Sequence, residues 1–389
     1  MQAKRLIFVV VTAVVAVAVP AAAGTGSIAE YTVPTANSQP LSMVTGPDGT
    51  LWFTEFLGNK IGRMAADGIV VAEYPIPTLD SRPDEIDVGP DGNLWFAEVL
   101  GNKIARITPT GVTTEFLVPT ANSRPTVVAP GPDGNVWFTE RGTVANPGNK
   151  VARVTPQGAI TEWTLPNPGS RPLGVTAGPD SNVWFTEQAG NRIGRIDPST
   201  GAITEFPLPN PGSLPWEITA GPDGNLWFTE FSGNRIGRIT TGGVITEFPV
   251  PTPASQPNTI RRGPDPNPAD NCAFQQQALG RTAFANRYGS FGGCVARLAR
   301  TKTLWFTETA GNRVAQVTTD GDIFEYVIPT PASQPIGIAH GPDGAVWFAE
   351  LAANKIGRLD VKTVGKPIAP GVRAVGAADP ASLEALDPQ

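Results

Sequence analysis

Residues 214–253 read LPWEITAGPDGNLWFTEFSGNRIGRITTGGVITEFPVPTP, and this stretch decides the fold of a chain of 389 residues. It contains four short runs of β-forming residues, namely WEITA, NLWFTE, RIGRIT and VITEFPV. The runs are separated by GPDG, by a Gly-Asn pair and by a third Gly-containing turn, all typical of hairpins. The proline-rich segment that follows cannot continue a strand, because proline lacks the amide hydrogen that the ladder needs. The stretch therefore predicts one sheet of four antiparallel strands.

The same unit recurs seven times along the chain. Its W-F-[TA]-E signature begins at Trp52, Trp95, Trp137, Trp184, Trp227, Trp305 and Trp347, so successive tryptophans are 43, 42, 47, 43, 78 and 42 residues apart. Four strands in a period of this length are typical of a propeller blade. We therefore predict an all-β fold, a seven-bladed β-propeller with four antiparallel strands per blade. The seven tryptophans are expected to be buried between blades.

The ends of the repeat region predict how the ring closes. A fourth-strand segment, residues 28–33 (IAEYTV), precedes the first complete unit, whereas the last unit stops after Leu359 without a fourth strand. If the N-terminal strand joins the last blade, both open edges disappear. This places the propeller at residues 27–360, with a loop insertion at residues 264–303 in the sixth unit.

The segments outside the ring are interpreted as an export signal and a tail. Lys4 and Arg5 precede an apolar run from Leu6 to Val19 and an Ala-Ala-Ala sequence, the order of a secretory signal peptide, which predicts removal of residues 1–23. The alternative is an uncleaved membrane anchor, although the run is short for a bilayer. Residues 361–389, rich in Ala, Pro and Gly, are predicted to form a flexible tail. We expect a secreted or periplasmic protein without a membrane span after signal cleavage.

The insertion in the sixth unit contains both cysteines of the chain, Cys272 and Cys294. Because the protein is expected to be exported, a Cys272–Cys294 disulfide is predicted, in preference to metal binding by two lone cysteines. The insertion joins the first and second strands of its unit. That position lies on the face opposite the usual ligand entrance of a propeller, so a stabilising or partner-binding role is expected there.

Composition narrows the range of functions. The net charge is −6, so a nucleic-acid partner has no electrostatic support. The chain has one histidine, His340, which precedes a GPDG turn at the end of a first strand and therefore lies away from the entrance. This scarcity argues against most zinc sites and against a Ser-His-Asp triad.

A group that is repeated in every blade is expected to be structural, because one ligand needs an asymmetric set of contacts. The glutamate that ends each signature is such a group, and we expect it to pair with a nearby base, such as Lys60 in the first unit. The alternative is a ring of carboxylates at the channel mouth that holds a divalent cation. A second possible cation site is the local acidic cluster of Asp84, Glu85 and Asp87, together with Glu98.

The residue after each connector proline differs between blades and begins the innermost strand at the entrance. Around the ring these residues are Leu41, Asp84, Thr126, Leu173, Trp216, Asn258 and Ile336. Asp84, Trp216 and Asn258 are predicted to form a small amphipathic binding patch. The alternative is that they are solvated rim residues, because pockets hold few polar groups.

Several patterns of the repeat resemble a known family. The patterns WFTE-x₂-GN-[KR]-IGRI, ITEFPLP and P-x-S-x-P-x-GIT-x-GPDG, which cover residues 27–359, closely resemble those of virginiamycin B lyases, the streptogramin lyase family. The resemblance implies a seven-bladed propeller and a lyase that linearises a cyclic depsipeptide antibiotic by elimination across an ester linkage. It also implies a histidine base, a magnesium ion held by carboxylates, and a second histidine that contacts the substrate.

Carried over residue by residue, the resemblance places the family's base at Ile336, in a connector that reads Gln334-Pro335-Ile336 where the family has Glu-Pro-His. The partner glutamate corresponds to Glu350, at the family's spacing after Ile336, and the substrate histidine corresponds to Asn258. Only Glu350 is retained, and Ile336 cannot take a proton. General-base catalysis commonly contributes about 10²–10⁴-fold, so the loss of the base argues against the family's known mechanism.

We therefore expect an exported, monomeric propeller that binds a small molecule, a peptide or a glycan at the channel entrance. The predicted ligand contacts are Asp84, Thr126, Trp216, Asn258 and Gln334. No catalytic residue is assigned, and Glu350 is the predicted ligand of a magnesium ion that the resemblance alone implies. The alternatives are a streptogramin lyase with an altered base and a metal-dependent lactone hydrolase that uses carboxylate and amide ligands.

Overall fold

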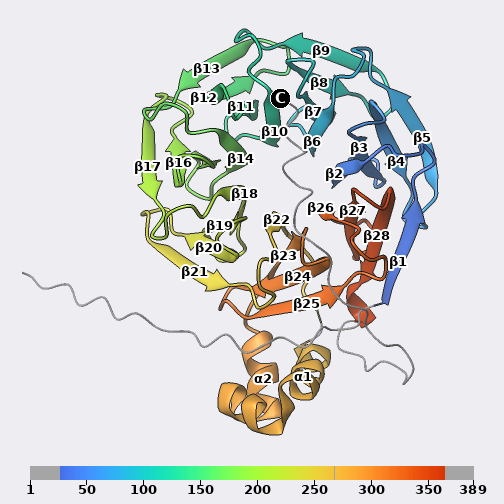
Figure 1. Ribbon diagram of the computed structural model, residues 1–389, viewed down its shortest axis with the longest axis vertical. Helices are drawn as coiled ribbons and strands as arrows, with labels where there is room; N and C mark the ends of the chain where they lie inside the picture. The colour runs from blue at the N-terminus through green and yellow to red at the C-terminus, as the bar shows by residue number, and fades with distance from the viewer. Residues whose placement is uncertain (1–26, 267, 364–389) are drawn as a thin grey trace, which may run out of the picture.

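The computed structural model describes residues 27–266 and 268–363, which form a ring of sheets around a common axis (Figure 1). These residues build seven sheets of four antiparallel strands each. The seven-bladed β-propeller predicted from the repeat is confirmed. None of the helices in the described ranges is both long and apolar enough to cross a membrane.

The blades follow one another along the chain. Blades 1 to 3 consist of β2 (Pro40–Thr45), β3 (Leu51–Glu55), β4 (Lys60–Met64) and β5 (Val70–Pro75); β6 (Pro83–Val88), β7 (Leu94–Glu98), β8 (Lys103–Ile107) and β9 (Thr113–Leu117); and β10 (Pro125–Pro130), β11 (Val136–Gly142), β12 (Pro147–Val154) and β13 (Ile160–Thr164). Blades 4 and 5 consist of β14 (Pro172–Ala177), β15 (Val183–Glu187), β16 (Arg192–Ile196) and β17 (Ile203–Pro207); and β18 (Pro215–Ala220), β19 (Leu226–Glu230), β20 (Arg235–Ile239) and β21 (Ile245–Pro249). Blades 6 and 7 consist of β22 (Pro257–Arg262), β23 (Thr303–Glu308), β24 (Arg313–Thr318) and β25 (Ile323–Val327); and β26 (Pro335–His340), β27 (Val346–Glu350), β28 (Lys355–Asp360) and β1 (Ser27–Thr32).

Turn residues and aromatic rings interlock within each blade. In blade 5, the turn residue Asp223 accepts a hydrogen bond from Nε1 of Trp227 at 3.0 Å, and this bond orients the indole. The ring of Trp227 stacks on Phe248 of β21, with ring centres 5.5 Å apart. Gly237 faces Phe228, and a Cβ at this glycine would lie 2.1 Å from the Phe228 ring. The glycine of the IGRI pattern is therefore required for close packing inside the blade.

The hydrophobic core consists of the interfaces between neighbouring blades. All seven tryptophans of the signature are at most 1% exposed, which confirms their predicted burial. Trp52 of blade 1, for example, packs with Leu94 and Phe96 of blade 2. Because each blade buries both of its faces, the stability of one blade depends on both neighbours.

The first strand of every blade lies nearest the axis and is irregular at its start (Figure 1). In β18, Pro215 pairs with Glu230, but the next paired residue is Ile218, so Trp216 and Glu217 form a bulge. The same register shift occurs in all seven first strands. Bulges redirect side chains and are frequent beside functional sites. The second and third residues of each first strand are thus candidates for ligand contact.

β1 closes the ring as predicted, by pairing antiparallel with β28 so that Ser27 lies opposite Asp360. The side chain of Asn354 adds a second link across the closure. Its Oδ1 accepts hydrogen bonds from the backbone amide and the hydroxyl of Ser38, at 2.8 and 3.0 Å. The two ends of the ring are therefore joined by a strand ladder and by side-chain bonds.

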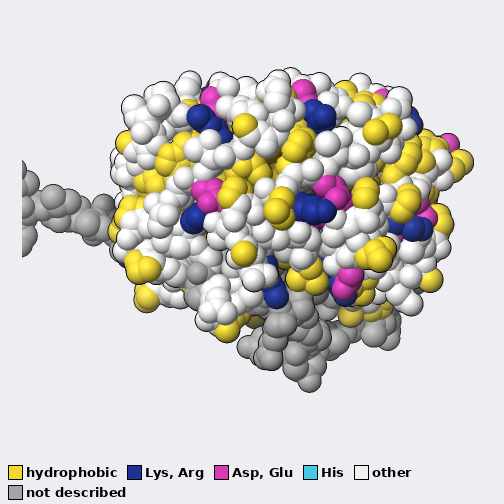
Figure 2. All heavy atoms as spheres, turned by 90° about the horizontal axis from the view of Figure 1, so that it is seen from above, with side chains coloured by type: hydrophobic (Ala, Val, Ile, Leu, Met, Phe, Trp, Pro, Cys, Tyr) yellow, Lys and Arg dark blue, Asp and Glu magenta, His cyan; other side chains and the backbone are white. Residues whose placement is uncertain are grey.

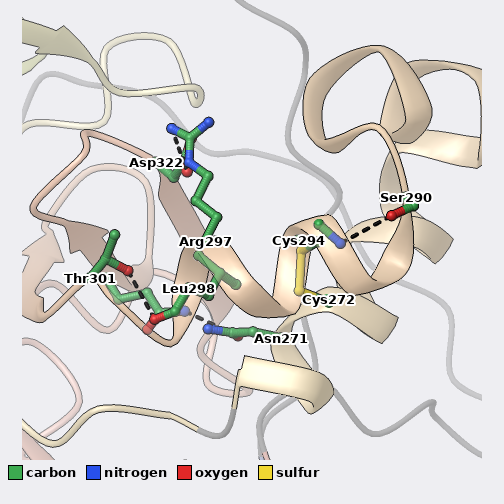
Figure 3. Close-up of a disulfide and its surroundings, with 10 residues drawn as sticks. Asn271, Cys272, Ser290, Cys294, Arg297, Leu298, Thr301 and Asp322 are labelled. Carbon is green, nitrogen blue, oxygen red and sulfur yellow. Dashed lines mark hydrogen bonds and ion pairs between the residues drawn. A yellow bond between two sulfur atoms is a disulfide. The ribbon is translucent and has the colours of Figure 1, made fainter.

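The segment predicted as a loop insertion contains two helices. They are α1 (Pro268–Tyr288), which is kinked at Gly280, and α2 (Phe291–Leu298). The Cys272–Cys294 disulfide links the two helices, which confirms the predicted pairing (Figure 3). Helices in this segment are the one departure of the described residues from an all-β fold, apart from the short helix η1 (Val361–Thr363).

The two helices pack against the outer strands of blade 6. Nε2 of Gln316, on β24, lies 3.2 Å from Oδ1 of Asn271 on α1, and both residues are buried. Arg297 of α2 pairs with Asp322, in the turn before β25, at 3.2 Å (Figure 3). The insertion is thus attached to its blade by polar contacts as well as by buried apolar residues such as Phe284.

The predicted signal peptide, residues 1–23, lies outside the described residues. The predicted flexible tail, residues 361–389, is described only as far as Thr363, where η1 ends.

Candidate functional site

The two faces of the ring expose different segments of the repeat. The connector face carries the proline-rich connectors and the loops between second and third strands. The turn face carries the turns between first and second strands, with the helical insertion in blade 6. Each first strand begins on the connector face with a proline that pairs with the glutamate of the signature, as Pro335 pairs with Glu350. The predicted ligand contacts all lie at or near these strand starts, on the connector face.

The threonine of the signature positions the start of the next first strand. Oγ1 of Thr186 accepts the amide of Gly174 in its own blade at 2.9 Å and donates to the carbonyl of Trp216 in the next blade at 2.7 Å. Thr229 donates to the carbonyl of Asn258 in the same way, at 2.6 Å. The hydroxyl therefore joins two blades beside the axis. This role was not predicted from the sequence, although the recurrence of threonine in WFTE was a signal for it.

Arg141 connects two of the predicted ligand contacts. Its guanidinium carbon lies 5.3 Å from the centre of the Trp216 ring, and its NH2 group donates to Oε1 of Gln188 at 3.3 Å. Burial and the charge of Glu85 raise the pKa of Asp84 to about 7, whereas the charge of Arg141 acts in the opposite direction. Arg141 follows the third signature, in a unit that carries extra residues at that point. The extra residues could have identified this loop as unusual from the sequence. The direction of the Arg141 side chain could not be predicted in that way.

The other predicted contacts differ in their surroundings. Trp216 is partly exposed and stacks on Phe231, with ring centres 4.7 Å apart. Thr126 and Asn258 are only 2% and 4% exposed, so they are not solvated rim residues. Oγ1 of Thr126 lies 3.1 Å from Oγ1 of Thr139. Gln334 lies in the last connector, where its carbonyl accepts the amide of Leu351 at 3.1 Å.

The glutamates that end the signatures do not pair with nearby bases, which corrects the expectation from the sequence. All seven are at most 1% exposed, and no donor among the described residues is placed to bond either carboxyl oxygen of any of them. Lys60 contacts Glu73 of β5 at 2.9 Å and Oγ1 of Thr35 at 2.6 Å. Both Lys60 and Glu73 remain partly exposed on the outer wall, where adjacent basic and acidic side chains recur (Figure 2).

Burial is the main cause of a raised pKa in all seven of these glutamates. The pKa rises to about 7 for Glu55, Glu140, Glu187 and Glu230, to about 8 for Glu98 and Glu350, and well above the usual range for Glu308. The charge of a fourth-strand glutamate adds to the rise, as that of Glu73 does for Glu55. Enclosed carboxyls that hold their protons to neutral pH do not form an open ring of cation ligands.

The described residues do not fit the magnesium ion that the family resemblance implies. Magnesium needs several accessible oxygen ligands in octahedral geometry. Glu350 is fully buried, and burial together with the charge of Glu30 raises its pKa to about 8. Within residues 27–266 and 268–363, no three His, Cys, Asp or Glu side chains are grouped so that they could hold a metal ion. No step of a mechanism is therefore assigned to a metal.

The acidic cluster of blade 2 is divided between two environments. Glu98 lies at the end of β7, beside Lys103 and Glu115 of the same blade. Glu85 is directed to the ring centre, where it pairs with Arg261 of blade 6 at 2.5 Å. Asp87 also lies within the electrostatic influence of Arg261. The cluster thus faces a base across the ring and not the glutamate of its own signature.

The position of the family's base has no proton acceptor in its side chain. Ile336 is 8% exposed, and its carbonyl accepts a hydrogen bond from Oγ1 of Thr307 at 2.6 Å. His340 ends the same strand opposite Val346 and is exposed on the turn face. Four residues of β-strand separate the two positions by about 13 Å. The single imidazole of the chain is therefore on the wrong side of the ring to act at the connector face.

Comparison with known proteins identifies close structural relatives. The virginiamycin B lyase of Staphylococcus aureus superposes with a TM-score of 0.72 at 37% identity, over 86% of this chain and 99% of that one. A catalytically inactive variant of the S. aureus enzyme, in which a histidine is replaced by alanine and which contains quinupristin, superposes with the same TM-score at 35% identity, over 86% of this chain and 99% of that one. A virginiamycin B lyase of Nocardia farcinica is 41% identical over 58 residues, which are 15% of this chain and 20% of that relative.

The family model of virginiamycin B lyases matches residues 8–281 and 285–366, a region that includes all seven blades. The S. aureus relatives are covered almost completely, whereas the alignment with the N. farcinica relative spans only a fifth of its length. Because the family model matches most of the sequence and the S. aureus relatives share the fold over nearly their whole length, this chain belongs to the virginiamycin B lyase family.

Proposed function

We propose that this protein is a ligand-binding member of its family that does not open a substrate through a histidine base. The observation that carries the proposal is the separation of Ile336 from the only histidine. Ile336 is the second residue of β26, at the connector face, and His340 ends the same strand on the turn face. No rotation of the His340 side chain spans a distance of about 13 Å.

A relative supports the separation of binding from catalysis. The S. aureus variant that lacks one histidine is described as catalytically inactive, and its structure nevertheless contains quinupristin. In that protein, the loss of an imidazole is therefore compatible with ligand retention. The present chain has isoleucine at the position that corresponds to the family's base, so the same separation is proposed for it.

The proposed binding surface is the connector face around Trp216, Asp84 and Arg141. Trp216 supplies an aromatic surface that is partly exposed, Arg141 lies over its ring, and Asp84 lies within the electrostatic influence of Arg141. Such a mixture suits an amphipathic ligand such as a modified peptide. We further propose that the protein is exported after removal of residues 1–23, and the Cys272–Cys294 disulfide agrees with an oxidising compartment.

The experiment that tests this function compares opening with binding. The purified protein is incubated with quinupristin and Mg²⁺, and the product is analysed by mass spectrometry, with S. aureus virginiamycin B lyase as the positive control. Binding is measured in parallel through tryptophan fluorescence. We expect no linear product from this protein. Enzymatic ring opening that disappears when EDTA is added would overturn the proposal.

A further inference from the structure

A group of charged side chains from three blades meets at the ring centre. Arg261 of β22 contacts Glu217 of the adjacent blade 5 at 3.4 Å and Glu85 of blade 2, across the ring, at 2.5 Å. Burial raises the pKa of Asp87, two residues after Glu85, to about 6, and the nearby charge of Arg261 acts in the opposite direction. We name Glu85, Asp87, Glu217 and Arg261 the axial cluster. It links first strands that lie on opposite sides of the axis.

The axial cluster is absent from the repeat and therefore is not needed to build a blade. Its members occupy the third and fifth residues of first strands. The equivalent positions in the described strands of the remaining blades hold uncharged residues, namely Ser42, Val127, Gly174, Gly337, Val44, Ala129, Thr176 and Ala339. The other blades have small or apolar residues at these positions, and burial of ionisable groups costs free energy. We therefore infer that the four ionisable residues serve a function rather than the stability of the fold.

The axial cluster contains more acidic groups than basic groups, and burial raises the pKa of Glu217 to about 8 and that of Asp87 to about 6. One guanidinium faces three carboxyl groups, and Glu85 and Glu217 are only 6% and 3% exposed. Arg261 contacts Oε1 of each glutamate, whereas Oε2 of Glu217 and Oε2 of Glu85 have no partner among the described residues. Asp87 accepts a hydrogen bond only from the backbone amide of Val88, at 2.7 Å, within the described part of the chain. The cluster thus retains acceptors that a further cation would satisfy.

Part of the axial cluster is accessible to solvent. The side chain of Arg261 is 24% exposed, so the ring centre is not sealed around it. Trp216 directly precedes Glu217, and Asp84 directly precedes Glu85, in the bulges that begin their strands on the connector face. A ligand on the proposed connector-face surface is therefore one residue away from two of the carboxyl groups of the cluster.

We propose that the axial cluster binds a cationic group, a primary ammonium or a guanidinium, of the ligand that occupies the connector face. The inference rests on the proposed binding function and adds the chemical class of the ligand. The cation donates to Oε2 of Glu217 and Oε2 of Glu85, beside Arg261, and its uncharged part packs on Trp216. An anionic group is disfavoured, since Arg261 is already engaged by two carboxylates. The charge of Arg141 acts on Asp84, so Arg141 is not a second partner for the axial cluster in this proposal.

The test uses a pair of dipeptide amides that differ in one charge, namely N-acetyl-Trp-Lys-amide and its counterpart with an acetylated lysine side chain. Affinities for the full protein are measured by isothermal titration calorimetry at pH 7.5 and low salt. We expect the lysine peptide to bind at least about tenfold more tightly, because a charge-assisted hydrogen bond in a buried site is worth that much.

Four variants separate ligand recognition from folding. Glu217→Gln should remove most of the preference for lysine, whereas Asp80→Asn, at a carboxylate that is 69% exposed in a connector, should leave it unchanged. Arg261→Met removes the internal competitor and should increase the affinity for the lysine peptide several-fold. Glu85→Gln provides a second test if Glu217→Gln or Arg261→Met fails to give a native circular dichroism spectrum.

The outcomes distinguish this inference from the proposed function. Equal binding of the two peptides would overturn the cation site but leave a connector-face binding function. A lysine preference that survives both Glu217→Gln and Glu85→Gln would overturn it too, as would failure of both peptides to bind. Opening of quinupristin by the unmodified protein would contradict the proposed function and would not change the comparison between the two peptides.

Discussion

The glutamates that end the seven signatures and the carboxyl groups of the axial cluster are both buried, but only the first set recurs in every blade. Glu98, in the first set, lies beside Lys103 and Glu115 of its own blade. Glu85, on the neighbouring strand of that blade, pairs with a guanidinium from the opposite side of the ring. Carboxyl groups that recur in every blade thus belong to the structure of the blade. Carboxyl groups that occur in one blade only, such as that of Glu85, make contacts at the ring centre instead.

The two kinds of tryptophan provide the largest expected contrast. Trp227 belongs to the repeat and is fully buried, and Trp216 occurs once and is partly exposed on the connector face. Trp227→Ala should lower the free energy of unfolding by about 3–5 kcal/mol, since it leaves a cavity between blades. Trp216→Ala should cost less than about 1 kcal/mol and weaken ligand binding. Urea denaturation followed by circular dichroism measures the free energy of unfolding of both variants. Equal losses of stability would contradict the distinction between the repeated and the single tryptophan.

The insertion in blade 6 also occurs only once in the chain, but it packs against the outer strands of one blade and not at the ring centre. It therefore tests whether every feature that occurs once serves the ligand. A double variant, Cys272→Ser with Cys294→Ser, should lose about 3 kcal/mol from the cooperative unit that contains the helices, by the chain-entropy estimate for a loop of this length. Peptide binding at the connector face should not change. A loss of binding in protein that retains its native spectrum would show that a unique segment on the turn face also serves the ligand.

The seventh blade combines a repeated and a unique position in one site. Glu350 ends a signature, and Ile336 lies at the position that the family resemblance assigns to the base. The double variant Ile336→His with Gln334→Glu restores the connector of the family resemblance. It should form linear quinupristin, which we expect neither the unmodified protein nor a control without a base to form, since a positioned base contributes about 10²–10⁴-fold. Ile336→Leu is the matched control, and a rate equal to that of the control would mean that more than the base is missing.

The pH dependence of stability provides the smallest expected effect and distinguishes two acids of the same blade. The pKa of Glu98 is raised to about 8 by burial and by the charge of Glu115, so its carboxyl stabilises the fold below its unfolded pKa, near 4.5. That contribution is lost as the pH rises towards about 8. Glu98→Gln should therefore increase stability by on the order of 1–2 kcal/mol at pH 8.5 and leave it unchanged at pH 4.

Glu115 should show the opposite sign. Its pKa is lowered, despite its burial, by hydrogen bonds from Lys103 and Thr78, so it stabilises the fold above its unfolded pKa and loses that effect as the pH falls. Glu115→Gln should destabilise the protein at neutral pH. Thermal unfolding of both variants across pH 4 to 8.5 makes the comparison, and parallel profiles would contradict the assigned environments.

The sequence contained enough information for the architecture and for part of the candidate site. Periodicity alone specified four strands per unit, since hairpin turns and alternating apolar residues are local properties. The last unit lacks a fourth strand after Leu359, and this absence predicted that the N-terminal strand closes the ring. Because the chain has two cysteines, only one disulfide pairing was possible. The connector Gln334-Pro335-Ile336, compared with the family's pattern, predicted without any coordinates that the family's base is missing. These conclusions need only the order of residues along the chain.

The tertiary structure decided which charged groups meet. Two glutamates of the same blade, Glu55 and Glu73, are candidate partners for Lys60. Glu55 is fully buried, whereas Glu73 is partly exposed at the outer wall, and Lys60 pairs with Glu73. Glu85 and Arg261 are 176 residues apart in the sequence and become neighbours only when the seven blades close into a ring. Periodicity describes each blade by itself, whereas the distance across the ring depends on all blades together, and for that reason the axial cluster is a property of the fold alone.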